Sequence, residues 1–183
     1  MNIPSDILEI FSKYYHDNPK LLATVLTHSE AVARKALQCA ESKKLDIDKE
    51  FVERAALLHD IGVVKCNAPS IFCFGKLPYI CHGVEGRKIL EKEGLYREAL
   101  VCERHTGSGL SAEYIKKENL PLPLRDMLPI SLEEKLICYA DKFFSKSKNL
   151  TEEKPLDSII RQMASFGEES LSRFMDLHNL FSN

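Results

Sequence analysis

The sequence of 183 residues predicts an all-α fold, a helical bundle that forms one domain over residues 1–183. Apolar residues recur three and four positions apart through most of the chain, which is the spacing of one helix face. Alternation of apolar and polar residues, the mark of a half-buried strand, does not persist over any long segment. The chain is long enough to bury a core of its own, and neither repeats nor a low-complexity linker divide it.

Three helices are expected in the first third of the chain. The Asn18-Pro19 pair ends the first of them. A long second helix follows and ends near Lys43-Lys44. Asp48 is placed to cap the third helix, which runs into His59-Asp60 before Gly62 ends it.

A loop-like stretch with Pro69, Gly75 and Pro78 interrupts the helical pattern over residues 62–81. A loop of that length in a compact domain is usually functional or contains a short helix. Its aromatic residues either stack on a base or fill the core; they are Phe72, Phe74 and Tyr79. Further helices are expected at residues 82–93, 96–105, 131–147, 155–165 and 168–181. The helix at 131–147 follows a Gly- and Pro-rich passage and opens with Ser131-Leu132-Glu133-Glu134, a capping-box pattern.

Composition and charge restrict the partners. The chain is 44% hydrophobic and 28% charged, as ordinary globular proteins are. Its net charge of −2 offers no basic footprint for a polynucleotide or an anionic membrane, so a small molecule is the expected partner. The start of the chain shows no secretory signal, and the apolar stretches fall short of the roughly 20 residues of a membrane span. Six cysteines without a CxxC pair are expected to be reduced thiols, and a cytoplasmic location follows.

Four of the six histidines and two aspartates fall where the local periodicity predicts inner helix faces: His28, His59, Asp60, His82, His105 and Asp141. A single inward histidine is more often a hydrogen-bonded core residue, but six such residues together are hard to explain in that way. Buried carboxylates are costly unless something positive meets them. Imidazole and carboxylate suit Fe, Mn, Co, Ni or Zn, and the absence of thiolates argues against a structural zinc site. The pattern therefore predicts a catalytic metal centre.

Over residues 20–150 the chain resembles the HD superfamily of metal-dependent phosphohydrolases. The resemblance rests on His28, on Leu57-Leu58-His59-Asp60-Ile61-Gly62, and on Tyr139-Ala140-Asp141-Lys142. It implies a helical bundle of the HD-domain type with a core at about 20–150, followed by C-terminal helices at 152–183. The segments His82-Gly83-Val84-Glu85-Gly86 and His105-Thr106-Gly107-Ser108-Gly109 match members of the superfamily that have additional histidines.

The resemblance also implies the ligand sets. His28, His59, Asp60 and Asp141 would hold a first metal, while His82 and His105 would hold a second one that shares Asp60. One or two ions per chain are expected, divalent or mixed-valent, and Asp60, His82 and His105 are the predicted catalytic residues. A metal at such a site lowers the pKa of its water toward neutrality.

Lys65, Arg104, Thr106 and Lys146 are the predicted substrate-binding residues. Many members of the superfamily that carry the His-Asp-Ile-Gly signature have a basic residue directly after the glycine. Lys65 is the nearest basic residue here, although it could equally be an ordinary surface lysine. Arg104 adjoins a ligand, and the glycine-flanked turn at Thr106 can cradle an oxyanion or simply end a helix. Lys146 lies five residues after Asp141. Lys142, about 100° from the metal-facing direction, is interpreted as part of a solvated face.

Three functions remain open. The favoured one is hydrolysis of a phosphoester or phosphoanhydride of a small metabolite, such as a nucleotide, by metal-activated water. The same six ligands also resemble those of di-iron oxygenases in this superfamily. A non-catalytic nucleotide-sensing domain is the third, although retention of all six ligand positions argues against it. The substrate, the metal and the oligomeric state stay undecided, and specificity is expected to reside in residues 62–81 and 106–130.

Overall fold

Helices dominate the computed structural model, which describes residues 3–147 and 149–182. The α-helices in this part of the chain are α1 (Ser5–Tyr15), α2 (Pro19–Ser42), α3 (Lys49–Leu58), α4 (His82–Lys92), α5 (Tyr96–Arg104), α6 (Ala112–Lys117), α7 (Leu132–Asp141), α8 (Leu156–Ser165) and α9 (Glu168–Phe181). Strand structure within the described residues is limited to an antiparallel pair, β1 (Asn67–Ala68) and β2 (Cys73–Phe74). The prediction of an all-α fold is confirmed. None of the described helices is both long enough and apolar enough to span a membrane.

Side-chain caps explain where several helices begin. The Asn18 side chain accepts a hydrogen bond from the Leu21 backbone N–H, and Pro19 occupies the first turn of α2, where its missing N–H is harmless. Asp48 caps α3 in the same way. Ser131 caps α7 by accepting from the backbone N–H of Glu134. The cap positions predicted at Asp48 and Ser131 are therefore confirmed.

The segment 62–81 contains short 3₁₀ turns, which are η1 (Ile61–Lys65), η2 (Pro69–Ile71) and η3 (Tyr79–Cys81). Cys73 and Ile71 are buried and anchor the segment to the helices. Of the two alternatives left open for this loop, a functional role or a hidden short helix, the structure bears out the short helical segments. Phe72 and Phe74 are 45% and 71% exposed, so neither fills the core.

The helices of the second half of the chain depart from the prediction in two places. A six-residue helix, α6, lies in the Gly- and Pro-rich passage, where the pattern is too short to be recognised. The helix at 131–147 ends at Asp141, because the next backbone bonds join residues three apart, from Phe143 N to Ala140 O and from Phe144 N to Asp141 O. Phe143 and Phe144 are both buried. On a continued helix the side chains of Phe143 and Phe144 would point about 100° apart. A turn at this point allows both rings to be buried.

Gly62 permits a close approach of two backbones. Helix α3 already ends at Leu58, so the expectation that Gly62 ends it is wrong. A Cβ at Gly62 would lie 2.1 Å from the His82 carbonyl oxygen and 2.2 Å from the Gly86 backbone nitrogen. Only glycine lets η1 contact α4 at this distance, and that contact brings the His59-Asp60 turn beside His82.

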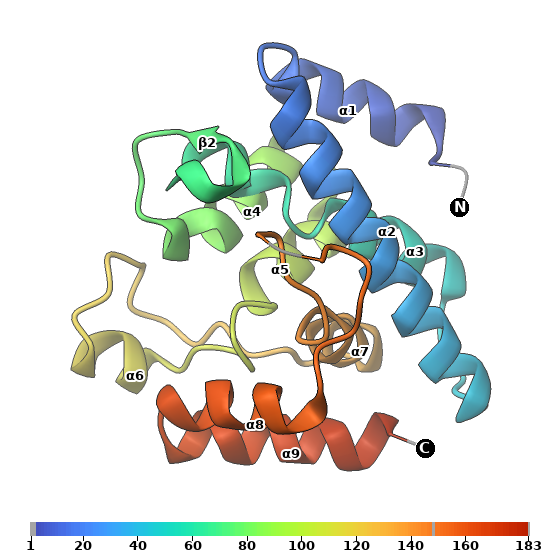
Figure 1. Cartoon of the computed structure of the whole chain (residues 1–183), viewed down its shortest axis with the longest axis vertical. Coiled ribbons are helices and arrows are strands. Elements are labelled where there is room, and N and C mark those ends of the chain that lie inside the picture. Colours follow the sequence, from blue (N-terminus) through green and yellow to red (C-terminus); the bar gives the residue numbers. More distant parts are fainter. Residues whose placement is uncertain (1–2, 148, 183) are drawn as a thin grey trace.

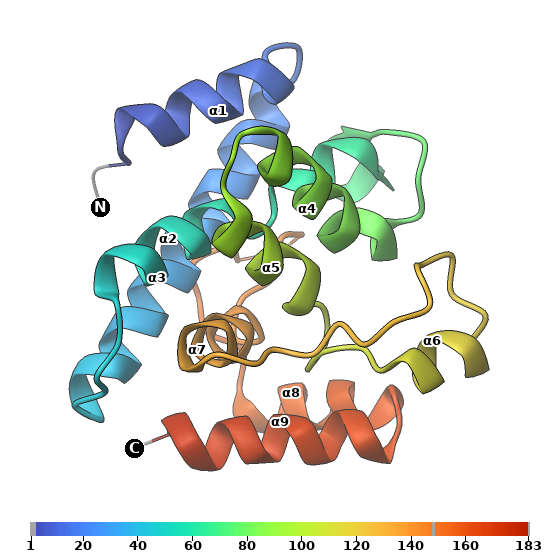
Figure 2. The ribbon, with the colours of Figure 1, turned by 180° about the vertical axis from the view of Figure 1, so that it is seen from behind.

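The apolar core has two main clusters, and α2 contributes to both. One cluster joins α1, the start of α2, α4 and α5, and the other joins the end of α2 to α3, α7, α8 and α9. Figures 1 and 2 show α8 and α9 side by side at the end of the molecule opposite α1, with α7 between them and the rest of the bundle. Helices from both clusters carry the predicted metal ligands, which therefore lie where the clusters meet.

Candidate metal centre

Helix ends position five of the six predicted ligands, and the sixth, His28, lies inside a helix. His28 lies within α2, whereas His59 and His105 directly follow α3 and α5. His82 opens α4, and Asp141 is the last residue of α7. All six residues are buried, with 0–7% of their surface exposed. Because α3 has already ended, the adjacent residues His59 and Asp60 both reach the same point, which a continuous helix would not allow.

Asp60 is the centre of the cluster, and its two carboxylate oxygens face different partners. Oδ2 lies 3.0 Å from His59 Nε2 and 3.3 Å from His28 Nε2. Oδ1 lies 3.5 Å from His105 Nε2 and 3.6 Å from His82 Nε2. One carboxylate thus bridges two groups of ligand atoms, as the resemblance implied.

The Oδ2 side contains a second carboxylate. Asp141 Oδ1 lies 2.9 Å from His28 Nε2 and 3.4 Å from His59 Nε2. Each of the four residues His28, His59, Asp60 and Asp141 offers one ligand atom, and these atoms all lie within 4.8 Å of one another. On the Oδ1 side, Asp60, His82 and His105 meet the same condition, and the two Nε2 atoms are 3.0 Å apart.

Backbone carbonyls orient three of the imidazoles. Nδ1 of His59, His82 and His105 donates to the carbonyl three residues earlier, at 2.6, 2.7 and 2.8 Å respectively. An imidazole that donates from Nδ1 keeps the lone pair of Nε2 free for a metal, and this outer hydrogen bond also holds the ring in place. Tyr15 further fixes the turn, since its hydroxyl donates to the Ile61 carbonyl at 2.9 Å.

The two sides differ in protonation. Burial opposes the charged form of His59, but the carboxylates of Asp60 and Asp141 outweigh it and raise its pKa to about 9. On the other side, burial and the neighbouring His105 lower the pKa of His82 to about 3. Burial also lowers the pKa of His105. Although burial alone would raise the pKa of Asp60, the charges of His59 and Lys146 hold it well below its usual range.

The donor set fits a transition metal. His59 Nε2 and Asp60 Oδ1 are buried without a hydrogen-bond partner among the described residues, whereas Asp60 Oδ2 is paired with the Lys146 ammonium at 2.7 Å. Buried polar atoms without partners are costly, and a cation that binds them removes the cost. Four imidazoles and two carboxylates are the ligands that Mn, Fe, Co, Ni and Zn accept. The cluster is therefore compatible with divalent metal binding.

A cavity of about 420 Å³ opens onto the Oδ1 side of the cluster and onto Asp141. Three lysines line this cavity, and two of them pair with carboxylates of the cluster. Lys146 Nζ lies 2.7 Å from Asp60 Oδ2, and Lys142 Nζ lies 2.7 Å from Asp141 Oδ2 while donating to the His105 carbonyl. The other residues lining the cavity are Tyr79, Ile80, His82, His105, Thr106, Gly107, Asp141, Phe144, Lys154, Gln162, Met163 and Phe166.

The predicted substrate-binding residues divide into two pairs. Thr106 and Lys146 line the cavity. Lys65 is exposed and Arg104 is held by Glu134, at 2.9 Å from both carboxylate oxygens, and neither of them lines the cavity. Arg104 adjoins His105 in sequence, but the helix directs the two side chains differently.

Lys142 corrects the sequence analysis. The helical angle assigns it to a solvated face, but the residue is only 8% exposed and pairs with Asp141. The assignment is wrong because α7 ends at Asp141, so that helical angles no longer describe the positions that follow. Sequence analysis also missed Lys154, which lies between α7 and α8 without any local signal. Tyr79, for which the sequence allows either the core or the site, stacks on His82 with ring centroids 4.7 Å apart.

Comparison with known proteins gives a family match. The HD domain matches residues 25–145. An uncharacterized protein of Methanocaldococcus jannaschii is 34% identical over 142 residues, which cover 75% of this chain and 74% of that protein. Two proteins named tRNA (cytidine(56)-2′-O)-methyltransferase, from Picrophilus torridus and Thermoplasma volcanium, are 32% and 30% identical over 73% and 86% of this chain. The matches span only 35% and 42% of those two proteins. No solved structure matches significantly.

Proposed function

This chain belongs to the HD-domain family, within the superfamily of metal-dependent phosphohydrolases, and on that premise we propose that it hydrolyses a phosphoester or phosphoanhydride of a small metabolite. One observation carries the proposal: a single cavity is lined by ligands of the His/Asp cluster and by three lysines. The methyltransferase activity in the names of two relatives is not carried over, because this chain covers less than half of each.

The residues that would hold metal are His28, His59, Asp60 and Asp141 for one ion, and Asp60, His82 and His105 for a second. When bound, such a metal supplies Lewis acidity toward a phosphoryl oxygen and a water of lowered pKa. The chain's own contribution is to hold the ligand atoms in place. Asp60 faces both groups, and the carbonyl bonds to Nδ1 keep three imidazoles turned toward it.

The lysines favour an anionic substrate. Burial and the charges of Lys142 and Lys146 together lower the pKa of Lys154. An anion that enters the cavity would relieve this repulsion between ammonium groups. A phosphate group carries up to two negative charges and several acceptor oxygens, so it suits a site with converging N–H donors. The proposed partner is therefore a small phosphorylated molecule and not a polynucleotide.

Phosphate release tests this proposal. The protein is stripped with a chelator, reloaded separately with Mn, Fe, Co, Ni or Zn, and assayed on 5′-, 3′- and 2′,3′-cyclic nucleotides, sugar phosphates and p-nitrophenyl phosphate. We expect turnover of at least one of these compounds, lost on stripping and restored by one metal. Asp60→Asn should abolish turnover, whereas Asp46→Asn, an exposed aspartate, should leave it unchanged. Turnover that survives complete stripping would refute the proposal.

A second candidate is a di-iron oxygenase. The observation that favours it is the sharing of one carboxylate by two groups of ligands, since two ions bridged by Asp60 could also be iron. Oxygen uptake on addition of substrate, together with a mixed-valent iron signal, would identify this activity. The lysine-lined cavity favours the hydrolase, because positive charge serves a phosphate more directly than it serves oxygen chemistry.

A further inference from the structure

A second cavity of about 220 Å³ adjoins the cavity of the metal centre. The two cavities share Ile80, Thr106, Gly107 and Phe166 in their linings. With volumes of about 220 and 420 Å³, they together fall within the range of about 300–1,000 Å³ that is usual for small-molecule sites. A molecule that extends from the metal cluster past Thr106 would therefore enter the second cavity.

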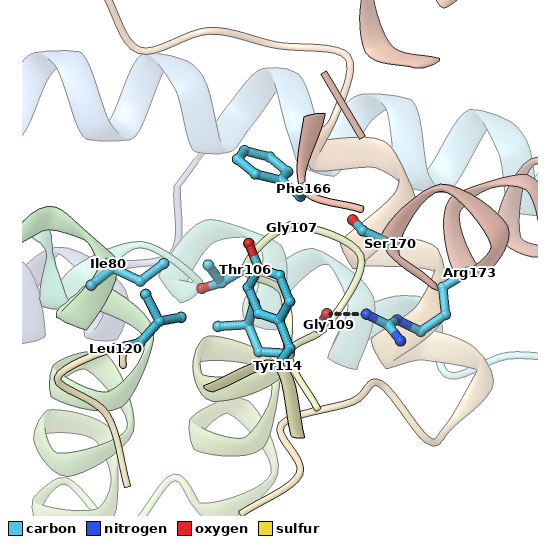
Figure 3. A pocket seen from close by; sticks show the side chains of 10 residues that line it. Ile80, Thr106, Gly107, Gly109, Tyr114, Leu120, Phe166, Ser170 and Arg173 are labelled. Atoms are coloured by element: carbon cyan, nitrogen blue, oxygen red, sulfur yellow. Dashed lines mark hydrogen bonds between the residues drawn. The ribbon is translucent and has the colours of Figure 1, made fainter. Parts of the chain in front are cut away.

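The second cavity is lined mainly by apolar and aromatic side chains. We call it the ring pocket and define it by Ile80, Leu110, Tyr114, Leu120 and Phe166. In the view of Figure 3, Ile80 and Leu120 lie on one side and Arg173 and Ser170 on the other, with Tyr114 and Phe166 between them. A lining of this kind suits a flat, uncharged ring, whereas a sugar would leave its hydroxyl groups without partners.

Two polar side chains of this pocket, Arg173 and Ser170, are hydrogen-bonded within the protein. The guanidinium of Arg173 donates to the Gly109 carbonyl at 3.2 Å and to Glu169 at 3.1 Å. Ser170 is hydrogen-bonded to Ser108. Nε of Arg173, however, is buried without a hydrogen-bond partner among the described residues. An acceptor on the edge of a ring would satisfy this donor, which a purely hydrocarbon ligand would not do.

Part of the pocket lies outside the family match. Phe166, Ser170 and Arg173 belong to the α8–α9 region, beyond the matched residues 25–145. Gly167, with φ of +105°, forms the turn between these helices in a conformation that L residues rarely adopt. The turn holds Phe166 over both cavities, and yet the ring remains 40% exposed. An aromatic face left partly open at the junction of two cavities is suited to stacking.

We propose that the ring pocket binds the nucleobase of a nucleoside monophosphate whose phosphate lies beside Lys142 and Lys146. The inference rests on the proposed function for the position of the phosphate and adds the class of substrate. Tyr114 and Phe166 provide the aromatic contacts, and Arg173 faces the polar edge of the base. Specificity then depends on α6 and on the α8–α9 turn, while the metal ligands come from the family core.

The experiment measures binding of the two product halves, so that no turnover intervenes. Metal-loaded protein is titrated calorimetrically with inorganic phosphate, with ribose, and with adenosine, guanosine, cytidine and uridine in the presence of saturating phosphate. The variants are Tyr114→Ala and Phe166→Ala, and the controls are Tyr96→Ala and Phe74→Ala, whose rings are 68% and 71% exposed and line neither cavity. Thermal melts verify that each variant is folded, and truncation of the partly exposed Phe166 removes little of the core.

We expect at least one nucleoside to bind, ribose to bind negligibly, and both ring-pocket variants to weaken the nucleoside about fivefold or more, as the loss of base stacking does. Phosphate affinity should be the same in all variants. Binding of phosphate without any nucleoside, or nucleoside binding that Phe166→Ala leaves intact, would overturn the ring pocket and leave the hydrolase standing. Nucleoside binding that depends on Phe166 in a protein that hydrolyses no phosphoester would support the pocket and refute the hydrolase.

Discussion

The two sides of Asp60 have the same ligand chemistry in opposite surroundings. The closed side, with His28, His59 and Asp141, contains a second carboxylate, and His28 and His59 are both 0% exposed. The open side, with His82 and His105, has imidazoles only, and both of them line the cavity, whereas Asp141 alone of the closed-side residues does so. The carboxylates raise the pKa of His59 to about 9, whereas the pKa of His82 falls to about 3. A metal on the closed side would be secluded from solvent, whereas a metal on the open side would face the cavity.

The largest expected effect comes from the residue that the two sides share. Asp60→Asn keeps the shape of the side chain but removes the charge that both groups of ligands face. We expect metal content to fall from the one or two ions per chain expected of the wild type to fewer than one, with loss of turnover. Elemental analysis of the purified variant measures this. A variant that kept one full ion would show that one side binds metal independently of Asp60.

The next largest effect concerns the contact that holds the sides together. Gly62→Ala places a methyl group 2.1 Å from the His82 carbonyl oxygen, so the backbones of η1 and α4 must separate. We expect a loss of about 3 kcal/mol in the free energy of unfolding, measured by urea denaturation. Gly94→Ala is the control, because a Cβ there meets no atom within 4 Å and only its φ of +78° opposes the change. Its cost should be about 1 kcal/mol. Equal losses would contradict the role assigned to Gly62.

Removal of the open side tests whether each group of ligands holds a metal of its own. The double variant His82→Ala/His105→Ala leaves His28, His59, Asp60 and Asp141 intact, so we expect two ions per chain to become one. Elemental analysis and titration with the preferred metal measure the change. One ion in both wild type and variant would mean that the two histidines serve the substrate instead. Loss of all metal would show that the closed side does not bind an ion alone.

The same double variant also tests the protonation state of His59, a ligand on the closed side. His59 has its pKa raised to about 9, so it carries a proton at pH 7 that a metal must displace. Metal affinity of the closed side should therefore rise with pH, by up to about tenfold per unit, and level off near pH 9. Calorimetry in two buffers of different ionisation enthalpy should detect about one proton released at pH 7. An affinity independent of pH between 6.5 and 8.5 would contradict this protonation state.

The smallest expected effect concerns the lysines that line the cavity. Lys146→Met removes one of the ammonium groups that line the cavity, and we expect inorganic phosphate to bind about tenfold more weakly, the scale of one charge-assisted hydrogen bond. Lys65→Met is the matched control, because Lys65 is exposed and lies outside the cavity lining. Calorimetric titration with phosphate measures both. A comparable loss in Lys65→Met would restore that residue as a phosphate contact.

Sequence periodicity predicted most helices, because each helix buries one face and the apolar residues of that face recur three and four positions apart. It also predicted the six ligand residues, since imidazoles and carboxylates rarely gather at inward positions unless they bind a cation. It failed where the local pattern was short, as at α6, and where helical angles were extended past a helix end. The solvated assignment of Lys142 is the clearest case, because α7 ends one residue earlier.

The sequence by itself determined the helical class, the caps at Asp48 and Ser131 and the identity of the His/Asp cluster. Only the tertiary structure decided which oxygen of Asp60 faces which histidine pair, that Lys142 lines the cavity, and that the α8–α9 turn borders a second pocket beside it. The physical reason is the range of the interactions. Helix formation depends on neighbours three and four residues away, whereas His28 and Asp141 meet across 113 residues and no local pattern encodes that distance.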